Sequence, residues 1–252
     1  GSLQMTMAVQ SLDPKVLKNI KRSNIRTSDY LALKPALDKA NLSSYGEVIV
    51  ALPGETFDSH METLSQLLDL DIDSVIPHSL MMLNGAELNS PDQRQKYGIE
   101  TKFRVIPRDF TMMKSGRGVI EVEEVVIANN TFDYNSYIRA RKIAYLISLI
   151  KNPGFNFILK FLSQSNIRPI NFLLLLLDKL ENSRTNSKNL NLIAFVDLLN
   201  RFTEDTKSEL WDNEKEIINY YQNPNNFSKL VSGEDGKNLI QSYVSEAFSE
   251  KM

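Results

Sequence analysis

Three short apolar segments in the first ninety residues constrain the fold more than any other feature of the chain. They cover residues 5–10, 46–52 and 75–83, and each ends in a polar or glycine-bearing turn. The first two are followed by helical patterns, an alternation that is typical of a parallel sheet. In (β/α) barrels the chemistry lies at the carboxyl ends of the strands. This rule selects a first set of candidate site residues: Gln10, Ser11, Gly54, Glu55 and His78.

Local signals support this interpretation. Asp13 before Pro14 predicts the start of a helix, and Thr56 predicts the N-cap of another over residues 57–69. The continuous apolar run 48–52 predicts a strand that is buried on both faces. His60 is expected on the exposed side of its helix.

The pattern changes after Pro91. Residues 101–107 and 119–128 predict a pair of strands around a turn at 114–118. The remainder predicts helices over 134–151, 154–164, 169–182, 189–210, 212–222 and 235–250. The predicted fold class is therefore α/β: the C-terminal half of a partial (β/α) barrel with three strands, then a β-hairpin extension and an all-helical region. The corresponding domains are 1–90, 91–133 and 134–252.

Composition excludes several classes of site. Among 252 residues there is no cysteine and there are only two histidines, so this polypeptide has no disulfide, no thiolate metal site and no cysteinyl iron–sulfur cluster. The net charge of −2 gives no reason to expect a nucleic-acid partner. The longest apolar run, 172–177, is far shorter than the roughly 20 residues that cross a bilayer. We expect a cytoplasmic protein without a membrane partner.

Three βα units do not close a parallel sheet, because the first strand keeps an open edge. The barrel interpretation therefore requires either a missing N-terminal barrel half or self-association.

Three blocks of sequence resemble radical S-adenosylmethionine (radical SAM) enzymes. Residues 9–22 resemble the fourth-strand region of that family, Val-Ala-Leu-Pro-Gly-Glu-Thr at 50–56 its fifth strand, and 76–88 its sixth strand and exit loop. The blocks follow one another in the order and at the spacing of the family. Residues 97–107 and 123–126 resemble the subgroup that carries an N-terminal cobalamin-binding domain.

The resemblance implies a radical reaction, and it also shows that the cluster-binding motif of the family is missing from this chain. Members of the family bind a 4Fe-4S cluster through Cys-x-x-x-Cys-x-x-Cys and cleave S-adenosylmethionine to a 5′-deoxyadenosyl radical, so the cofactor supplies the difficult chemistry. This chain lacks the cysteine motif. It is interpreted as the C-terminal fragment of such an enzyme, inactive alone. The resemblance implies that the cluster and cobalamin belong to the full-length protein, which would carry out methyl transfer or carbon-skeleton chemistry on a small-molecule substrate.

The resemblance also assigns residues to the cofactor wall. Gln10 and Arg22 have the twelve-residue separation of a pair that contacts S-adenosylmethionine, where the arginine binds the methionyl carboxylate. Ser11 adjoins them. The remaining cofactor-binding candidates are Ile49, Ala51, Leu52 and Gly54 on the fifth-strand block, with Leu80 and Met81 on the sixth.

Within this wall, residues 49–52 would lie near the adenine. Ala51 stands where the family often has glycine. The backbone of 80–82 would meet the adenine edge, and His78 would face the substrate. No catalytic residue and no metal ligand is predicted in this chain.

The same residues have plain structural interpretations. Gln10 and Ser11 could bond the turn at Asp13, Arg22 could be a solvated cation at a helix end, and Glu55 could be a charge at a helix start. At the level of function, the alternative is a degenerate, non-catalytic barrel and helical module that binds a partner protein. A third hypothesis, a cobalamin-free relative that modifies a peptide or RNA, has no support from the charge balance.

Overall fold

The computed structural model divides the chain into two compact units. Unit 1 comprises residues 1–78 and 139–186, and unit 2 comprises 79–138 and 187–252. Each unit therefore combines two stretches that are distant in sequence, and each is described by itself below. The proposed domain boundaries at 90 and 133 stay a prediction. The structure describes residues 5–24, 27–40, 42–70, 72–155, 157–182 and 189–249.

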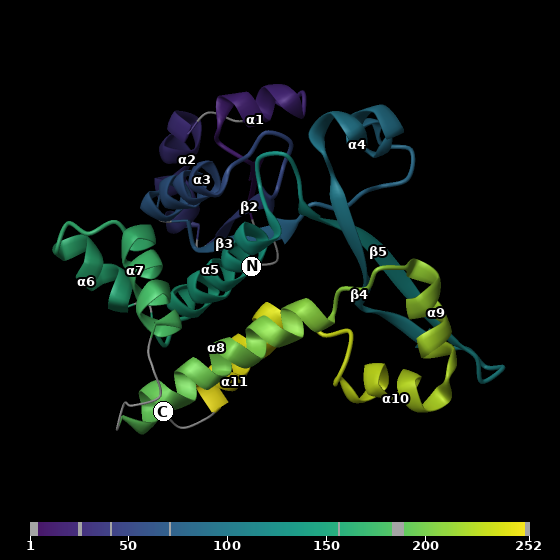
Figure 1. Ribbon diagram of the computed structural model, residues 1–252. Coiled ribbons are helices and arrows are strands. Elements are labelled where there is room, and N and C mark those ends of the chain that lie inside the picture. The colour runs from purple at the N-terminus through teal and green to yellow at the C-terminus, as the bar shows by residue number, and fades with distance from the viewer. Residues whose placement is uncertain are drawn as a thin grey trace. The chain divides into compact units, whose positions relative to one another are not determined.

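Unit 1 is built on a small parallel sheet (Figure 1). Its strands β1 (Met5–Gln10), β2 (Ser44–Val50) and β3 (Ser74–Ser79) lie in the order β1-β2-β3. β1 runs parallel to β2, with Met5 opposite Ser44 and Ala8 opposite Glu47. The α/β class expected from the sequence is confirmed.

Helices connect these strands as the cap residues indicated. The helix α1 (Pro14–Asn19) begins after Asp13, whose carboxylate accepts bonds from the N–H groups of Lys15 and Val16. α2 (Thr27–Lys39) follows, and it stays continuous through its internal proline. α3 (Phe57–Asp69) begins after Thr56, which forms a capping box with Ser59. These reciprocal bonds satisfy N–H groups that the first helical turn leaves without partners.

Among the described residues, one face of the sheet is covered and the other is partly exposed. The residues of β2 alternate between buried and half-buried positions, and the buried set includes Gly46. A Cβ atom on Gly46 would lie 3.6 Å from Leu67 of α3, so α3 packs against this face. The opposite face carries Glu47, Ile49 and the exposed side chain of Ile76. The prediction that 48–52 is buried on both faces is therefore wrong: hydrophobicity cannot show which faces of a strand are covered.

The third strand is also shorter than the predicted segment 75–83. After Ser79 the chain leaves the parallel sheet, and the Leu80 carbonyl accepts a bond from Val126 N–H at 2.8 Å. The Met82 N–H donates to the backbone carbonyl of Glu124 at 2.9 Å. These two bonds make Met81 an antiparallel bridge partner of Val125. An apolar run continues across this change of partner, so the sequence pattern does not reveal it.

Three more helices contribute to unit 1. They are α6 (Phe157–Gln164), α7 (Pro169–Glu181) and the later part of α5 (Tyr134–Lys151). α7 packs against α3. The segment before α7 is fixed by Arg168, which pairs with Glu62 at 3.2 Å and Asp69 at 3.1 Å.

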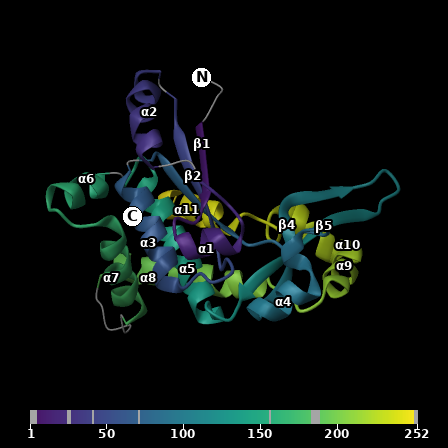
Figure 2. The same ribbon diagram turned by 90° about the horizontal axis from the view of Figure 1, so that it is seen from above.

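Unit 2 is built on a long two-stranded antiparallel ribbon. β4 (Glu100–Met112) pairs with β5 (Gly118–Ala128), and α9 (Glu214–Gln222) packs against both strands (Figure 2). α11 (Leu239–Ser249) packs along α8 (Leu190–Ser208). The described helices of this unit, besides the start of α5, are the 3-10 turn η1 (Glu87–Asn89), α4 (Pro91–Tyr97), α8 (Leu190–Ser208), α9 (Glu214–Gln222), α10 (Pro224–Ser232) and α11 (Leu239–Ser249).

The predicted hairpin is confirmed, but two helices were missed. α4 has Ser90 as its N-cap, and α10 has Asn223 as its N-cap, Pro224 in its first turn and Gly233 as a left-handed C-cap. Pro224 and Gly233 can each interrupt a helical pattern, yet here they delimit a short helix. The predicted helix 235–250 contracts to α11 because residues before Leu239 form a loop.

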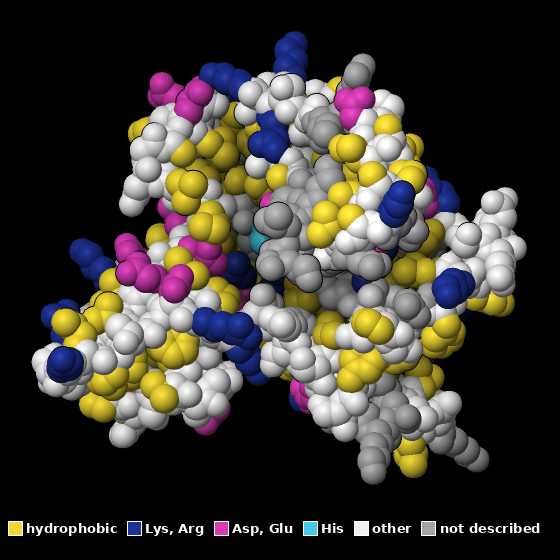
Figure 3. Space-filling view, turned by 180° about the vertical axis from the view of Figure 1, so that it is seen from behind, with side chains coloured by type: hydrophobic (Ala, Val, Ile, Leu, Met, Phe, Trp, Pro, Cys, Tyr) yellow, Lys and Arg dark blue, Asp and Glu magenta, His cyan; other side chains and the backbone are white. Residues whose placement is uncertain are grey.

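Apolar side chains also reach the surface. Figure 3 shows them on one face of the molecule in several separate patches among polar and charged side chains. The exposed set includes Phe157 and Phe161 on α6, and Met112 and Met113 at the hairpin. Among the described helices, none combines the length and apolarity that a bilayer crossing requires.

Candidate functional site

The candidate site lies where β1 and β2 end side by side. Gln10 is the last residue of β1 and pairs with Val48 after an irregularity in the register. Its φ of 59° places it in the left-handed region, which is uncommon for a residue other than glycine. Ser11 follows and is fully buried. Such strained positions cluster at functional sites, where surrounding contacts hold them in place.

The structure brings Arg22 to this strand end. Its guanidinium donates to the carbonyl of Ala8 in β1, and its Nε donates to Asn24 Oδ1 at 3.1 Å. Asn24 in turn donates to the carbonyl of Ser11 at 2.7 Å. Gln10, Ser11 and Arg22 therefore share one corner of unit 1, and Arg22 is not simply a solvated helix-end cation. The sequence interpretation missed Asn24, because a lone loop asparagine carries no signal.

The turn after β2 forms the adjacent part of the corner. Ala51 is fully buried with a φ of 65°, and Leu52 is 2% exposed. Gly54 has a φ of 82°, and a Cβ atom there would lie 2.4 Å from Asn19 Nδ2. That nitrogen donates to the carbonyl of Pro53 at 2.9 Å, which ties α1 to the turn. The positive φ at position 54 therefore favours glycine, and a larger residue would also displace the Asn19 side chain.

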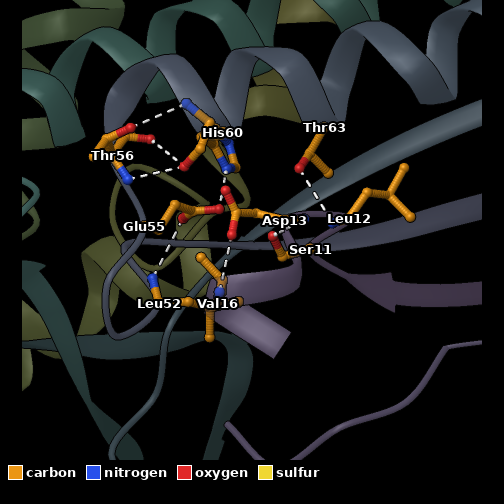
Figure 4. Close-up of polar contacts among 10 residues, drawn as sticks. Ser11, Leu12, Asp13, Val16, Leu52, Glu55, Thr56, His60 and Thr63 are labelled. Atoms are coloured by element: carbon orange, nitrogen blue, oxygen red, sulfur yellow. Dashed lines mark hydrogen bonds and ion pairs between the residues drawn. The ribbon is translucent and has the colours of Figure 1, made fainter. Parts of the chain in front are cut away.

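A buried pair lies beneath this turn (Figure 4). Glu55 and His60 are both fully buried, and Glu55 Oε1 lies 3.2 Å from His60 Nδ1. Glu55 Oε2 accepts a bond from the Leu52 N–H at 3.3 Å. The prediction for His60 is thus wrong, because His60 does not lie on the exposed side of α3. Glu55 does lie at the start of α3, directly before the N-cap Thr56, but it is buried. His60 precedes the buried Leu64 by one helical turn, so both face inward.

The loop after β1 is fixed to the same helix. The Leu12 N–H donates to Thr63 Oγ1 at 3.2 Å (Figure 4). The Asp13 N–H donates to Ser11 Oγ at 3.2 Å, so Ser11 does bond the turn at Asp13. The two strand ends and the start of α3 therefore form one hydrogen-bonded corner.

Ile49 and His78 lie on the open face of the sheet. His78 Nε2 is 3.5 Å from Glu47 Oε1, and the His78 side chain is 51% exposed. Ile49 is half-buried two residues from Glu47 on the same strand, and so on the same face. Both candidates are therefore accessible from that face.

Leu80 and Met81 belong to unit 2, whereas the residues of the corner belong to unit 1. The Leu80 carbonyl and the Met82 N–H are bonded to β5. In an antiparallel bridge of this type, the N–H and C=O of Met81 itself point away from β5. Of the three residues 80–82, Met81 has the backbone groups best placed for another partner.

A guanidinium at a strand end suits a carboxylate ligand such as the methionyl group of S-adenosylmethionine. A guanidinium has five N–H donors, and the two bonds above engage two of them. A 4Fe-4S cluster does not fit this chain, because no cysteine is present. Within the described ranges, there is also no grouping of three or more acidic or histidine side chains that could hold a metal ion.

No family model matches the chain. It is 27% identical over 150 residues to the cobalamin-dependent radical SAM methyltransferase TokK of Streptomyces tokunonensis. It is 25% identical over 150 residues to a 2-(S-pantetheinyl)-carbapenam-3-carboxylate methyltransferase of Streptantibioticus cattleyicolor. Each match covers 58% of this chain and 21% of the relative, so the matched region spans about a fifth of either relative. The chain is a distant relative of cobalamin-dependent radical SAM methyltransferases.

Proposed function

We propose that this chain forms the C-terminal barrel half of a cobalamin-dependent radical SAM methyltransferase. In this proposal it provides part of the S-adenosylmethionine wall and part of the substrate wall. The cluster and cobalamin are held by other segments of the protein. When bound, these groups and S-adenosylmethionine supply radical and methyl-transfer chemistry.

The observation that carries the proposal is the position of Arg22. A side chain twelve residues after Gln10 returns to the carboxyl end of β1 and bonds the Ala8 carbonyl there. It does so beside the β2 turn, at the edge where parallel α/β sheets place their ligands. A solvated cation would have no reason to be fixed by Asn24 at this strand end.

The residues of the corner then have distinct roles. Arg22 binds the methionyl carboxylate through a charge-assisted pair, with Gln10 as a polar neighbour. Ala51 and Leu52 present backbone to the adenine, in a turn that Glu55 holds through the Leu52 N–H. Ser11 and Gly54 shape the two loops. Ile49 and His78 face the space that the rest of the barrel would enclose, so His78 contacts the substrate.

The test uses protein expressed from the complete reading frame that encodes this chain, with S-adenosylmethionine binding measured by calorimetry. The expected result is binding by the wild type and at least tenfold weaker binding by Arg22→Ala, since a charge-assisted pair contributes on the order of 1.5–3 kcal/mol. Arg22→Lys keeps the charge without the planar fork and is expected to be intermediate. Lys15→Ala removes an exposed cation of α1 and serves as the matched control.

Two results would contradict the proposal. Wild-type protein that does not bind S-adenosylmethionine would exclude a cofactor wall, and stable association with a protein partner would then favour the non-catalytic module. Equal binding by the Arg22→Ala and Lys15→Ala variants would exclude the assigned role of Arg22.

A further inference from the structure

Unit 2 contains a cavity that the proposed function does not use. It has a volume of about 240 Å³ and lies between the end of α8, the helices α9 and α10, and the loop before α11. Its wall includes Trp211 and Tyr220, whose ring centroids are 5.2 Å apart with planes tilted by 51°. Two aromatic faces that meet at such an angle form a corner. Because the face of an aromatic ring carries partial negative charge, this corner attracts organic cations.

Two carboxylates in the lining are held in fixed orientations. The Tyr243 hydroxyl donates to Asp205 Oδ2 at 2.8 Å, and the Tyr221 hydroxyl donates to Asp235 Oδ2 at 2.8 Å. Burial, reinforced by the adjacent carboxylate, raises the pKa of both phenols above the usual value. The phenols therefore stay protonated, and each donates a hydrogen bond to its carboxylate oxygen.

The cavity already receives ammonium groups from the chain itself. Lys229 Nζ lies 5.8 Å from the centroid of the Tyr220 ring and donates to the Tyr220 hydroxyl at 3.1 Å. Lys237 Nζ lies 3.7 Å from Asp205 Oδ2 and 5.6 Å from the centroid of the Tyr243 ring. Both aromatic and carboxylate surfaces of this region thus accept cations in the described structure.

The net charge of the cavity lining is negative, which also favours a cation. Its four carboxylates exceed its two lysines by two charges, and Arg104 offsets one of these by donating to Glu209 at 3.1 Å. A cation in the cavity would be attracted both by the negative charge of the lining and by the aromatic ring faces. An anion would be repelled by both.

We propose that this cavity binds an organic cation of the guanidinium or alkylammonium class. The apolar part of the ligand lies against Trp211 and Tyr220, and its N–H groups face Asp205 and Asp235. This inference does not depend on the proposed methyltransferase function, because every residue that carries it lies in unit 2 outside the strand-end corner.

The chain has one tryptophan, so the fluorescence of Trp211 reports directly on this cavity. The probe is propylguanidinium chloride. Potassium chloride at matched ionic strength controls for screening, and propylurea is the neutral molecule of the same shape. The expected result is a saturable fluorescence change with propylguanidinium and at least tenfold weaker binding of propylurea. A peptide with one internal arginine distinguishes a protein side chain from a free small molecule as the source of the cation.

Two variants test the geometry. Asp235→Asn keeps an oxygen acceptor for Tyr221 but removes the charge, and it is expected to weaken propylguanidinium binding about tenfold. Lys237→Met removes the competing ammonium and is expected to strengthen binding several-fold, which keeps the test decisive if the first variant does not fold. Glu214→Gln, at an exposed site outside the lining, is the matched control. Equal responses to propylguanidinium, propylurea and salt would overturn the proposal, as would unchanged affinity in both Asp235→Asn and Lys237→Met.

Discussion

The two units bury ionisable side chains in different ways. In unit 1 Glu55 pairs with His60, five residues away, and bonds the Leu52 N–H of its own turn. In unit 2 Arg104 of β4 donates to Glu123 of β5 at 2.5 Å and to Glu209 after α8 at 3.1 Å. The first arrangement fixes one turn at a strand end. The second joins three segments of the chain, so its loss should affect the whole unit.

The largest expected effect is that of Arg104→Met. The side chains of Arg104 and Glu123 are 12% and 6% exposed, and removing one partner leaves a buried charge without compensation. We expect a loss of about 3–5 kcal/mol in the free energy of unfolding, measured by urea denaturation. The matched control is Lys102→Met on the same strand, because Lys102 pairs with the exposed Asp212. That surface pair is expected to contribute less than about 1 kcal/mol. Equal losses in the two variants would show that burial does not make the Arg104 network more important to unit 2 than a surface pair.

Glu55→Ala is expected to have a smaller and more local effect. The change removes an acceptor of the Leu52 N–H and a partner of His60, which should destabilise unit 1 by about 1–3 kcal/mol. Hydrogen exchange should accelerate at the Leu52 amide. Glu62→Ala, on the exposed side of the same helix, is the control. If exchange at Leu52 does not change, Glu55 does not hold the turn.

Ala51→Gly is expected to have the smallest effect and the opposite sign. Ala51 has a φ of 65°, a conformation that costs a residue with a Cβ atom about 1–2 kcal/mol. Glycine relieves this strain but loses more chain entropy on folding, so we expect a net stabilisation of about 0.5–1 kcal/mol by thermal denaturation. The same substitution at Ala8, which lies within strand β1, should destabilise. A loss of stability in both variants would show that position 51 is not strained.

The position of Ala51 also explains one departure from the radical SAM pattern. The resemblance placed glycine where this chain has alanine. The structure shows that the backbone there adopts the left-handed conformation that glycine favours. The alanine is compatible with the turn at some cost, so this departure does not remove the turn itself.

Some features of the fold and the site were predictable because their causes are local. Asp13 and Thr56 cap helices through bonds to residues two or three positions away, and α3 spans the predicted 57–69. The hairpin and α5 follow in the same way from turn residues and periodicity. In the candidate site, the strand-end positions of Gln10 and Ser11 came from the βα alternation.

Other features were missed because they depend on residues that are distant in sequence, or on which face of a strand or helix is covered by other segments. The pattern of β2 could not show that one face is covered and the other is partly exposed, and the apolar run through residues 80–83 concealed a change of partner from the parallel sheet to β5. His60 was placed on the exposed side of α3, yet it is fully buried. The aromatic and carboxylate groups of the cavity in unit 2 come from α8, the segment between α8 and α9, α9 itself and the loop before α11, and no motif links them in sequence.

The sequence by itself determined the α/β alternation, the helix caps, the hairpin and the resemblance to radical SAM enzymes, because each depends on neighbouring residues or on short blocks in order. Only the tertiary structure decided that Arg22 reaches the end of β1, that Glu55 and His60 are buried beneath the β2 turn, and that Arg104 joins Glu123 to Glu209. The reason is physical. A cap forms within one helical turn, but the value of a charge depends on whether other segments exclude water from it.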